Sequence, residues 1–179
     1  MPSSIYDIDP AHSSAHFSVR HMMISNVKGE FTKVSGTVTF SADNLADSKV
    51  EATIDVASLH THDEQRDAHL KSADFFDVAK YPEIKFVSKS IEPHGQGEYK
   101  MKGDLTIHGV TKEVTLDVEG PTPEVKDPWG NTKAGATATV KINRKDFGLV
   151  WNVALEAGGV LVGEAVSISL EVELTRRAA

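Results

Sequence analysis

Residues 50–56 read VEATIDV, a strict alternation of apolar and polar residues. Successive side chains of a β-strand point to opposite faces, so Val50, Ala52 and Ile54 would share an apolar face and the residues between them a polar one. The same period of two returns in residues 34–40, 99–107, 114–118, 136–142 and 166–174. Runs with one apolar and one wet face predict an antiparallel sheet around a single interior, not a parallel sheet buried on both sides.

The rest of the chain predicts about eight strands and one short helix. We expect strands at residues 13–23, 30–40, 50–59, 84–91, 99–107, 113–119, 136–142 and 163–174. A turn is expected around residues 26–29, and residues 120–134 should form a long polar loop. Residues 147–162 fit a strand, a short helix or a lid. Repeated hairpins with few helices are typical of an up-and-down barrel or a sandwich.

Alternation stops at residues 61–73, where good helix formers take over. Thr61, with Glu64 three residues later, predicts a capping box. We therefore expect one short helix near residues 63–73.

Several inward positions carry small side chains, namely Gly36, Ala52, Gly103, Ala136 and Ala138. Small inward residues on a closed sheet leave space, and a barrel of about eight strands either fills its interior or holds one small ligand. Empty space inside an apolar barrel predicts a hydrophobic ligand. The residues predicted to line this tunnel are Phe17, Val19, Phe40, Ala52, Ile54, Phe76, Phe86, Met101, Leu105, Ala138, Val140 and Ile168.

The chain has 179 residues, which we assign to a single domain over residues 1–179. Its 19 Lys and Arg against 26 Asp and Glu give a net charge of −7, which disfavours nucleic acid or an anionic membrane surface as the main partner. It has no cysteine, so disulfides, thiolate metal sites and cysteine nucleophiles are excluded. Residues 1–14 do not read as a signal peptide, and no run reaches the roughly 18 apolar residues of a membrane span. We therefore expect a cytoplasmic protein with no transmembrane segment.

Motifs in a fixed order make the chain resemble a known family. They are YDIDP at 6–10, FSVRH at 17–21, RDAHLKSADFFD at 66–77, YPEIKF at 81–86, GDLTIHGVT at 103–111 and RKDFG at 144–148. In this combination the sequence is similar to the YceI-like, polyisoprenoid-binding family over nearly its whole length. The resemblance implies a single lipocalin-like antiparallel β-barrel with a long apolar tunnel, and a homodimer. It also implies a bound isoprenoid lipid, such as an isoprenoid quinone or a polyprenyl phosphate, or a fatty amide.

Four side chains are candidates to hold the head group of such a ligand: His21, Arg20, His60 and Arg66. His21 shares the apolar face of its predicted strand, so it would orient the ligand, unless it is a core histidine bonded to the backbone. Arg20 points the other way and is expected in an ion pair with a carboxylate, unless a bulge re-aims it. Arg66 and Asp67 are expected to anchor the helix.

The tail of the ligand would dominate its affinity. Burial of each CH₂ group contributes on the order of 0.8 kcal/mol, so a long prenyl chain has ample driving force. Polar residues would then decide only the orientation and the choice of head group. A neutral quinone needs one or two hydrogen-bond donors, whereas a diphosphate needs a basic patch on an acidic protein, so we expect a neutral isoprenoid.

The histidines leave an enzymatic alternative open. His60 and His62 continue the inward-facing positions of the third predicted strand, and His69 lies on the predicted helix near Asp67. Histidine and aspartate are residue types that can bind zinc. There is no H-E-x-x-H motif, however, and no G-x-S-x-G elbow surrounds the candidate nucleophiles Ser13, Ser58 and Ser72. We therefore predict a non-catalytic carrier of an isoprenoid lipid or similar amphiphile, with no catalytic residue, metal or cofactor. The alternative is a metal- or histidine-dependent enzyme acting on a lipid-like substrate.

Overall fold

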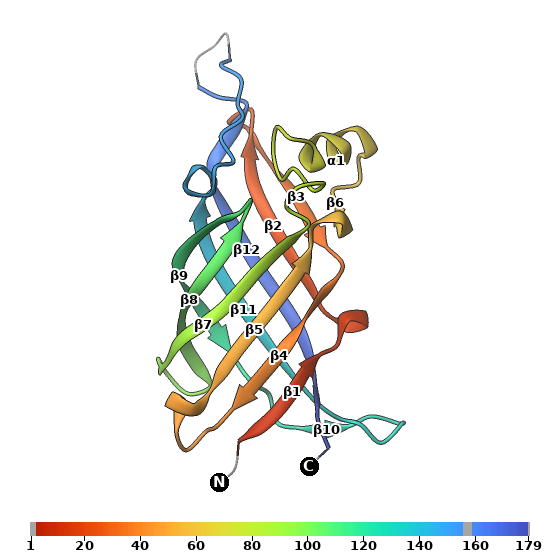
Figure 1. Cartoon of the computed structure of the whole chain (residues 1–179), viewed down its shortest axis with the longest axis vertical. Coiled ribbons are helices and arrows are strands. Elements are labelled where there is room, and N and C mark those ends of the chain that lie inside the picture. The colour runs from red at the N-terminus through yellow and green to blue at the C-terminus, as the bar shows by residue number, and fades with distance from the viewer. Residues whose placement is uncertain (1–2, 156–158, 179) are drawn as a thin grey trace.

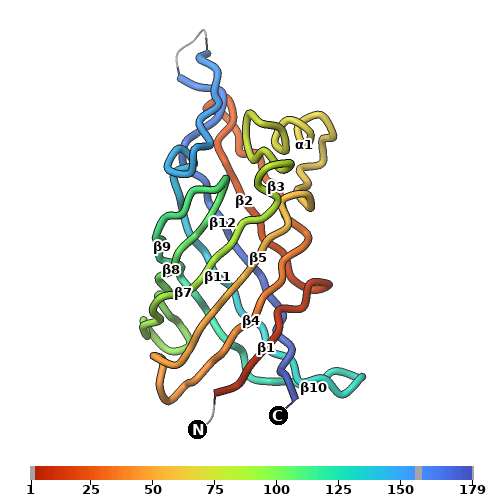
Figure 2. The backbone as a smooth tube through the Cα atoms, in the orientation of Figure 1, coloured from red at the N-terminus to blue at the C-terminus, as the bar shows by residue number. Residues whose placement is uncertain are grey.

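The computed structural model describes residues 3–155 and 159–178, which form an elongated β-barrel with a helix at one end (Figures 1 and 2). The strands are β1 (Ser4–Ile8), β2 (Ser14–His21), β3 (Ser25–Phe31), β4 (Val34–Phe40), β5 (Lys49–Asp55), β6 (Leu59–His60), β7 (Glu83–Pro93), β8 (Glu98–Ile107), β9 (Val110–Glu119), β10 (Val125–Lys126), β11 (Thr132–Asn143) and β12 (Val162–Arg176). The helix is α1 (Glu64–Lys71), and short 3-10 helices are η1 (Pro10–His12), η2 (Leu45–Asp47), η3 (Val56–Ser58) and η4 (Arg144–Phe147). Figure 1 shows that β1 starts and β12 ends opposite α1.

Eight antiparallel strands close the barrel in the order β11, β9, β8, β7, β5, β4, β1 and β12, and β12 pairs back to β11. The all-β antiparallel barrel of about eight strands with one helix, predicted from alternation and from the family resemblance, is confirmed. One edge of β12 pairs with β11, and its other edge is long enough to pair with two strands. Its last residues pair with β1, and its earlier residues pair with β2, which carries β3 and β6 beyond the ring.

β1 completes the ring, although its sequence did not predict a strand. Tyr6 lies opposite both Val38 of β4 and Arg176 of β12, so β1 bridges the gap between these two strands. Only Tyr6 and Ile8 of β1 are buried apolar residues, and two alternating positions are too few to show a period of two. Because the strand is held from both sides, its place depends on its neighbours more than on its own pattern.

The first hairpin turn differs from the prediction. The turn expected around residues 26–29 is wrong, since β3 occupies that segment. The chain instead turns at Met22 and Met23, whose φ angles are 51° and 64°. Two successive left-handed residues match the twist of a hairpin, but Asn and Gly normally occupy such positions, so methionine gives no sequence signal for it.

Helix α1 falls within the predicted range but begins at a different cap. Its N-cap is Asp63, whose carboxylate accepts a hydrogen bond from the backbone N–H of Arg66 at 3.0 Å. The capping box predicted at Thr61 is therefore wrong. Arg66 donates from Nε to Thr61 Oγ1 at 2.9 Å and from Nη2 to the Thr61 carbonyl at 2.6 Å. Asp67 accepts hydrogen bonds from the Thr61 amide and hydroxyl, so Arg66 and Asp67 anchor the helix as expected.

The small inward residues do not all leave space. A Cβ on Gly103 would stand 2.5 Å from Cζ of Phe86, so the ring fills the room beside this glycine. A Cβ on Gly36 would stand 2.1 Å from the carbonyl oxygen of Glu51, where β4 and β5 approach closely. The expectation is thus wrong for these glycines. It holds for the alanines that line the interior, namely Ala52, Ala136 and Ala138.

The apolar strand faces point into the barrel, so the interior is both the core and the wall of a cavity. The largest fully buried side chains are Val34, Val56, Phe147 and Leu174. Among the described residues, no helix combines the length and the apolar character needed to cross a membrane.

A cluster of charged residues fastens η1 to the barrel. The Asp9 carboxylate accepts hydrogen bonds from Lys133 Nζ of β11 and from His12 Nδ1, each at 2.9 Å. Lys133 Nζ also lies 3.4 Å from the Glu173 carboxylate of β12. The hydrogen bond from Lys133, followed by that from His12, lowers the pKa of Asp9 to about 2.

We expect Asp9 to make the barrel sensitive to acid in a defined range. Its pKa in the unfolded chain is about 3.9, above the folded value, so its contribution to stability is complete well above pH 4 and is lost as the pH falls to about 2. Asp9→Asn should lower the urea midpoint at pH 7 and flatten its decline between about pH 4 and pH 2. Asp146→Asn is the control, since this exposed carboxylate has no hydrogen bond or ion pair with the described residues. A decline in Asp9→Asn as steep as in the parent chain would contradict the prediction.

Candidate ligand-binding cavity

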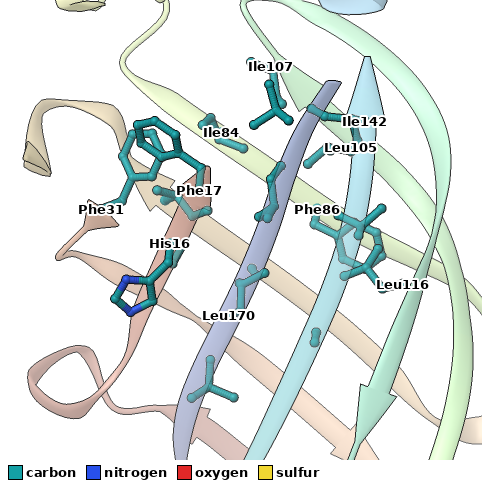
Figure 3. A pocket seen from close by; sticks show the side chains of 18 of the residues that line it. His16, Phe17, Phe31, Ile84, Phe86, Leu105, Ile107, Leu116, Ile142 and Leu170 are labelled. Carbon is teal, nitrogen blue, oxygen red and sulfur yellow. The ribbon is translucent and has the colours of Figure 1, made fainter. Parts of the chain in front are cut away.

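A cavity of about 600 Å³ occupies the barrel interior, and its lining is predominantly apolar. All twelve residues predicted to line a tunnel, from Phe17 to Ile168, contribute to this lining. Figure 3 shows lining side chains from β2, β3, β7, β8, β9, β11 and β12, and His16 is the polar one among those labelled. The alternation in the sequence therefore places apolar side chains around a space as well as against each other.

The cavity extends along much of the barrel. On β12 its lining residues run from Val162 to Leu174. At about 3.3 Å per residue this stretch measures roughly 40 Å along the strand, and a strand tilt of about 40° reduces it to roughly 30 Å along the barrel axis. The hydrocarbon core of a bilayer is also about 30 Å thick. The cavity thus has the length to hold an extended lipid chain.

Most charged lining side chains gather at the α1 end. Arg20 and His21, at the end of β2, lie there with Asp63, Gln65 and Arg66 of the α1 region (Figure 1). Arg20, Asp63 and Gln65 are exposed as well as lining the cavity. The cavity therefore reaches solvent beside α1.

Three rings pack together at this end. The ring centroid of His69 lies 4.7 Å from that of Trp151 and 5.1 Å from that of Phe75. Trp151 belongs to residues 147–162, predicted as a strand, a short helix or a lid. After η4 the described part of this segment is irregular, with one isolated bridge between Ala154 and Val160, and residues 156–158 lie outside the described residues. Trp151 lines the cavity and so covers part of its α1 end.

The opposite end is lined by rings and by the start of the predicted polar loop. Phe40 and Tyr99 pack edge to face with their centroids 6.1 Å apart, and both line the cavity. Gly120 and Pro121 join them. The loop expected at residues 120–134 is shorter than predicted, because it contains β10 and because β11 already begins at Thr132. This end contributes no charged side chain to the described lining.

His21, one of the predicted head-group residues, lines the cavity. Neither ring nitrogen of His21 forms a hydrogen bond or an ion pair with the described residues. The alternative of a core histidine bonded to the backbone is therefore wrong. The ring is available to a ligand as a donor or an acceptor.

Arg20 also lines the cavity, contrary to its position in the alternation. β12 is irregular opposite this residue, with Val162 paired to His21 and Val166 paired to Val19. Such a bulge can re-aim neighbouring side chains. The predicted ion pair is wrong: Arg20 Nη2 donates to the carbonyl of Met23 at 3.2 Å, and no described carboxylate lies within ion-pair distance.

The other two predicted head-group residues have different positions. Arg66 lines the cavity, although its guanidinium is bonded to Thr61 as described above. His60 does not line the cavity and lies outside it, with Nε2 at 3.1 Å from His62 Nδ1. Three of the four predicted residues therefore line the cavity at its α1 end.

The histidines of the enzymatic alternative do not converge. His69 Nε2 lies 2.9 Å from Asp74 Oδ2 and its ring packs against Trp151, apart from the His60 and His62 pair. Within the described residues, the set of three metal-ligating side chains whose donor atoms lie within 4.8 Å of one another is Asp9, His12 and Glu173. A single ion held by the three histidines His60, His62 and His69 is therefore not supported by the geometry.

Arg144 is a lining residue that the list of candidates missed. Its side chain is 3% exposed and donates to four backbone carbonyls: Nε to Gly163 at 2.7 Å, Nη1 to Leu149 at 2.5 Å and Trp151 at 3.0 Å, and Nη2 to Val162 at 3.2 Å. Burial lowers the pKa of this guanidinium, and the charge of Glu164 opposes the shift. The signal was present in the sequence, since Arg144 continues the inward parity of Val140 and Ile142. Arg144 thereby holds both ends of the segment that carries Trp151.

Comparisons with known proteins agree with this fold. A model of the YceI-like domain matches residues 6–174. The UPF0312 protein SAS2572 of Staphylococcus aureus (strain MSSA476) is 39% identical over 170 residues, which cover 95% of this chain and 96% of the relative.

Solved structures show the same barrel. BcnA of Burkholderia cenocepacia superimposes with a TM-score of 0.76 at 27% identity, covering 93% of this chain and 98% of that chain. A polyisoprenoid binding domain from Saccharophagus degradans has a TM-score of 0.68 at 14% identity, covering 96% and 98% of the two chains, which shows a shared fold. With its motifs, its barrel and a family match over nearly its whole length, this chain belongs to the YceI-like domain family.

Proposed function

We propose that this chain is a non-catalytic binding protein that carries a long-chain isoprenoid lipid inside its barrel. The observation that carries this proposal is the apolar cavity of about 600 Å³. Its length of roughly 30 Å suits an extended chain, and each buried CH₂ group contributes on the order of 0.8 kcal/mol. The domain of the same fold from Saccharophagus degradans is described as polyisoprenoid binding, which supports the choice of lipid class.

The head group is proposed to lie at the α1 end and to offer oxygen acceptors, as an isoprenoid quinone and a polyprenyl phosphate both do. His21 is the lining side chain there whose ring has no partner among the described residues. Arg20, Arg66 and Arg144 each already donate to backbone carbonyls. With their donors partly used and a net charge of −7, a neutral quinone-like head group fits better than a phosphate.

Native mass spectrometry of freshly purified protein tests this proposal directly. A bound species of defined mass, extracted with organic solvent and identified as a prenyl chain, would support it and would name the head group. The same spectrum reports the oligomeric state, for which we propose a homodimer. Protein that stays free of ligand and does not bind added prenyl quinone or prenyl phosphate would overturn the proposal.

Replacing His21 should weaken the choice of head group while leaving tail binding intact. One hydrogen bond contributes about 0.5–1.5 kcal/mol, so His21→Leu should reduce the preference for a prenyl quinone over the headless hydrocarbon of equal length by roughly 2- to 10-fold. The measurement is a competition titration with the two ligands. His16→Leu is the matched control on β2, because His16 also lines the cavity but its Nε2 is 2.8 Å from Ser14 Oγ. Equal effects of both variants would contradict a specific role for His21.

A further inference from the structure

His60 and His62 bring two imidazole nitrogens together on the outside of the barrel beside α1. His60 Nε2 lies 3.1 Å from His62 Nδ1, and the ring centroids are 4.3 Å apart. Metal–nitrogen bonds to histidine measure about 2.0–2.1 Å, so an ion bound to both nitrogens at this separation would subtend an angle of about 100°. That angle lies between those of tetragonal and tetrahedral ions. Without an ion, this contact is a hydrogen bond between the two rings, so chelation requires the donating ring to move its proton to its other nitrogen and both rings to rotate.

The backbone at His62 creates this spacing. In a continuous strand, side chains two residues apart are separated by roughly 6.6 Å along the chain. His62 has a φ of 64°, which is uncommon for a residue other than glycine. This left-handed turn, directly before the N-cap of α1, folds the second ring back toward the first. Strained backbone of this kind clusters at functional sites.

Asp67 lies behind the first histidine of the pair. Its Oδ2 is 3.6 Å from His60 Nδ1, and its Oδ1 accepts a hydrogen bond from the Thr61 amide at 2.9 Å. A carboxylate facing Nδ1 favours the tautomer that carries its proton there, which leaves a lone pair on Nε2. Metal-binding histidines commonly donate this proton to a carboxylate, and a small approach of the His60 ring would make that hydrogen bond to Asp67.

We propose that His60 and His62 form a binding site for one divalent transition-metal ion, with water completing its coordination. Two imidazoles and water suit Cu²⁺, Ni²⁺ and Zn²⁺, and Cu²⁺ should bind most tightly. Mg²⁺ and Ca²⁺ prefer oxygen ligands and should not bind here. The site is independent of the proposed lipid, because His60 does not line the cavity.

The other group of metal-ligating residues is a weaker candidate. Asp9, His12 and Glu173 converge, but Lys133 Nζ lies 2.9 Å from Asp9 and 3.4 Å from Glu173. The ammonium already neutralises these carboxylates and occupies the position that a cation would take. His60 Nε2 and His62 Nδ1 are 3.1 Å apart, too close for a cationic side chain to lie between them, and the nearby Arg66 guanidinium is already bonded to the hydroxyl and carbonyl of Thr61.

Titration of the protein without a histidine tag tests the site. We expect isothermal titration calorimetry to detect one Cu²⁺ per chain, and electron paramagnetic resonance to detect nitrogen ligands. His60→Gln and His62→Gln should each lower the affinity at least tenfold, and both side chains are exposed, so the fold should be unaffected. His94→Gln, at an exposed turn, and His12→Gln, in the other group, are the controls and should leave the affinity unchanged.

Three results would overturn the proposal. The first is an unchanged Cu²⁺ affinity in the double variant of His60 and His62. The second is a loss of binding in His12→Gln, which would move the site to the cluster around Asp9. The third is a parent protein that binds no Cu²⁺. None of these depends on whether the barrel carries a lipid.

Discussion

Ala138→Phe is expected to abolish binding of a long lipid while the barrel stays folded. Ala138 lines the cavity on β11, and the added ring would project into empty apolar space. A ring across a narrow tunnel blocks an extended chain, so we expect lipid occupancy in native mass spectra to fall at least tenfold. The free energy of unfolding, measured with urea, should change by less than about 1 kcal/mol, because the ring can enter the cavity that Ala138 lines.

Ala134→Phe on the same strand is the matched control. Ala134 is 4% exposed and does not line the cavity, so the ring would have to displace packed neighbours. Overpacking of this kind costs about 1–3 kcal/mol. If both variants lost stability equally, the interior at Ala138 would be a packed core. If Ala138→Phe bound lipid as tightly as the parent chain, the ligand would occupy another place.

Arg144→Met is expected to cause the largest loss of stability of any single substitution considered for this chain. The guanidinium is almost completely buried and donates to four carbonyls, which the thioether of methionine cannot do. Each buried acceptor left without a donor costs about 1–3 kcal/mol, and part of this loss is recovered by water. We therefore expect the free energy of unfolding to fall by about 3–5 kcal/mol.

Unfolding of Arg144→Met should begin in the segment that Arg144 holds. Arg144 holds the carbonyls of Leu149 and Trp151 on one side of the loop and those of Val162 and Gly163 on the other. Limited proteolysis should therefore cut residues 149–162 before the rest of the barrel.

Lys145→Met is the control for Arg144→Met. Lys145 is an exposed neighbour whose Nζ pairs with Glu164 at 2.7 Å, and such surface pairs contribute little to stability. A loss below about 1 kcal/mol in Arg144→Met would show that the carbonyls find other donors.

Arg144 also connects stability to the proposed function. It fixes the backbone of Trp151, and Trp151 packs against His69 of α1 at the end where the cavity reaches solvent. A loosened Trp151 should release a bound lipid faster, even where the equilibrium fold survives. The rate at which Arg144→Met releases a fluorescent prenyl chain, monitored by transfer of the chain to detergent micelles, would measure how Arg144 affects ligand release.

Much of the wall of the barrel was predictable from the sequence. Alternation of apolar and polar residues is a local property, because it follows from the pleat of a single strand. It placed eleven of the twelve predicted residues, among them Ala52, Phe86 and Leu105, on the inner faces of strands, whereas Phe76 lies in the turn after α1. The same parity points inward at Arg144, but arginine side chains are mostly exposed, so parity alone does not predict a buried arginine.

Other features depend on partners far away in the chain. β1 is a strand because β4 and β12 lie on either side of it, and its five residues carry too short a pattern to show this. Arg20 reaches the cavity because β12 is irregular opposite it, which no residue of β2 encodes. Met22 and Met23 form a turn that their side chains do not favour, because the pairing of β2 with β3 requires it.

The alternation alone predicted antiparallel strands around an apolar interior, since side-chain parity and hydrophobicity act within each strand. The choice of a barrel over a sandwich came from the family resemblance, and the closure of the ring depends on the pairing of β12 with β11. Tertiary structure alone decided which small residues leave space and which do not. Ala138 faces a cavity, whereas the room beside Gly103 is filled by Phe86 from the neighbouring strand. It also brought His60 within 3.1 Å of His62 and kept His69 apart from them. Volume and side-chain convergence depend on strand register and on backbone turns, which are fixed only when the whole ring closes.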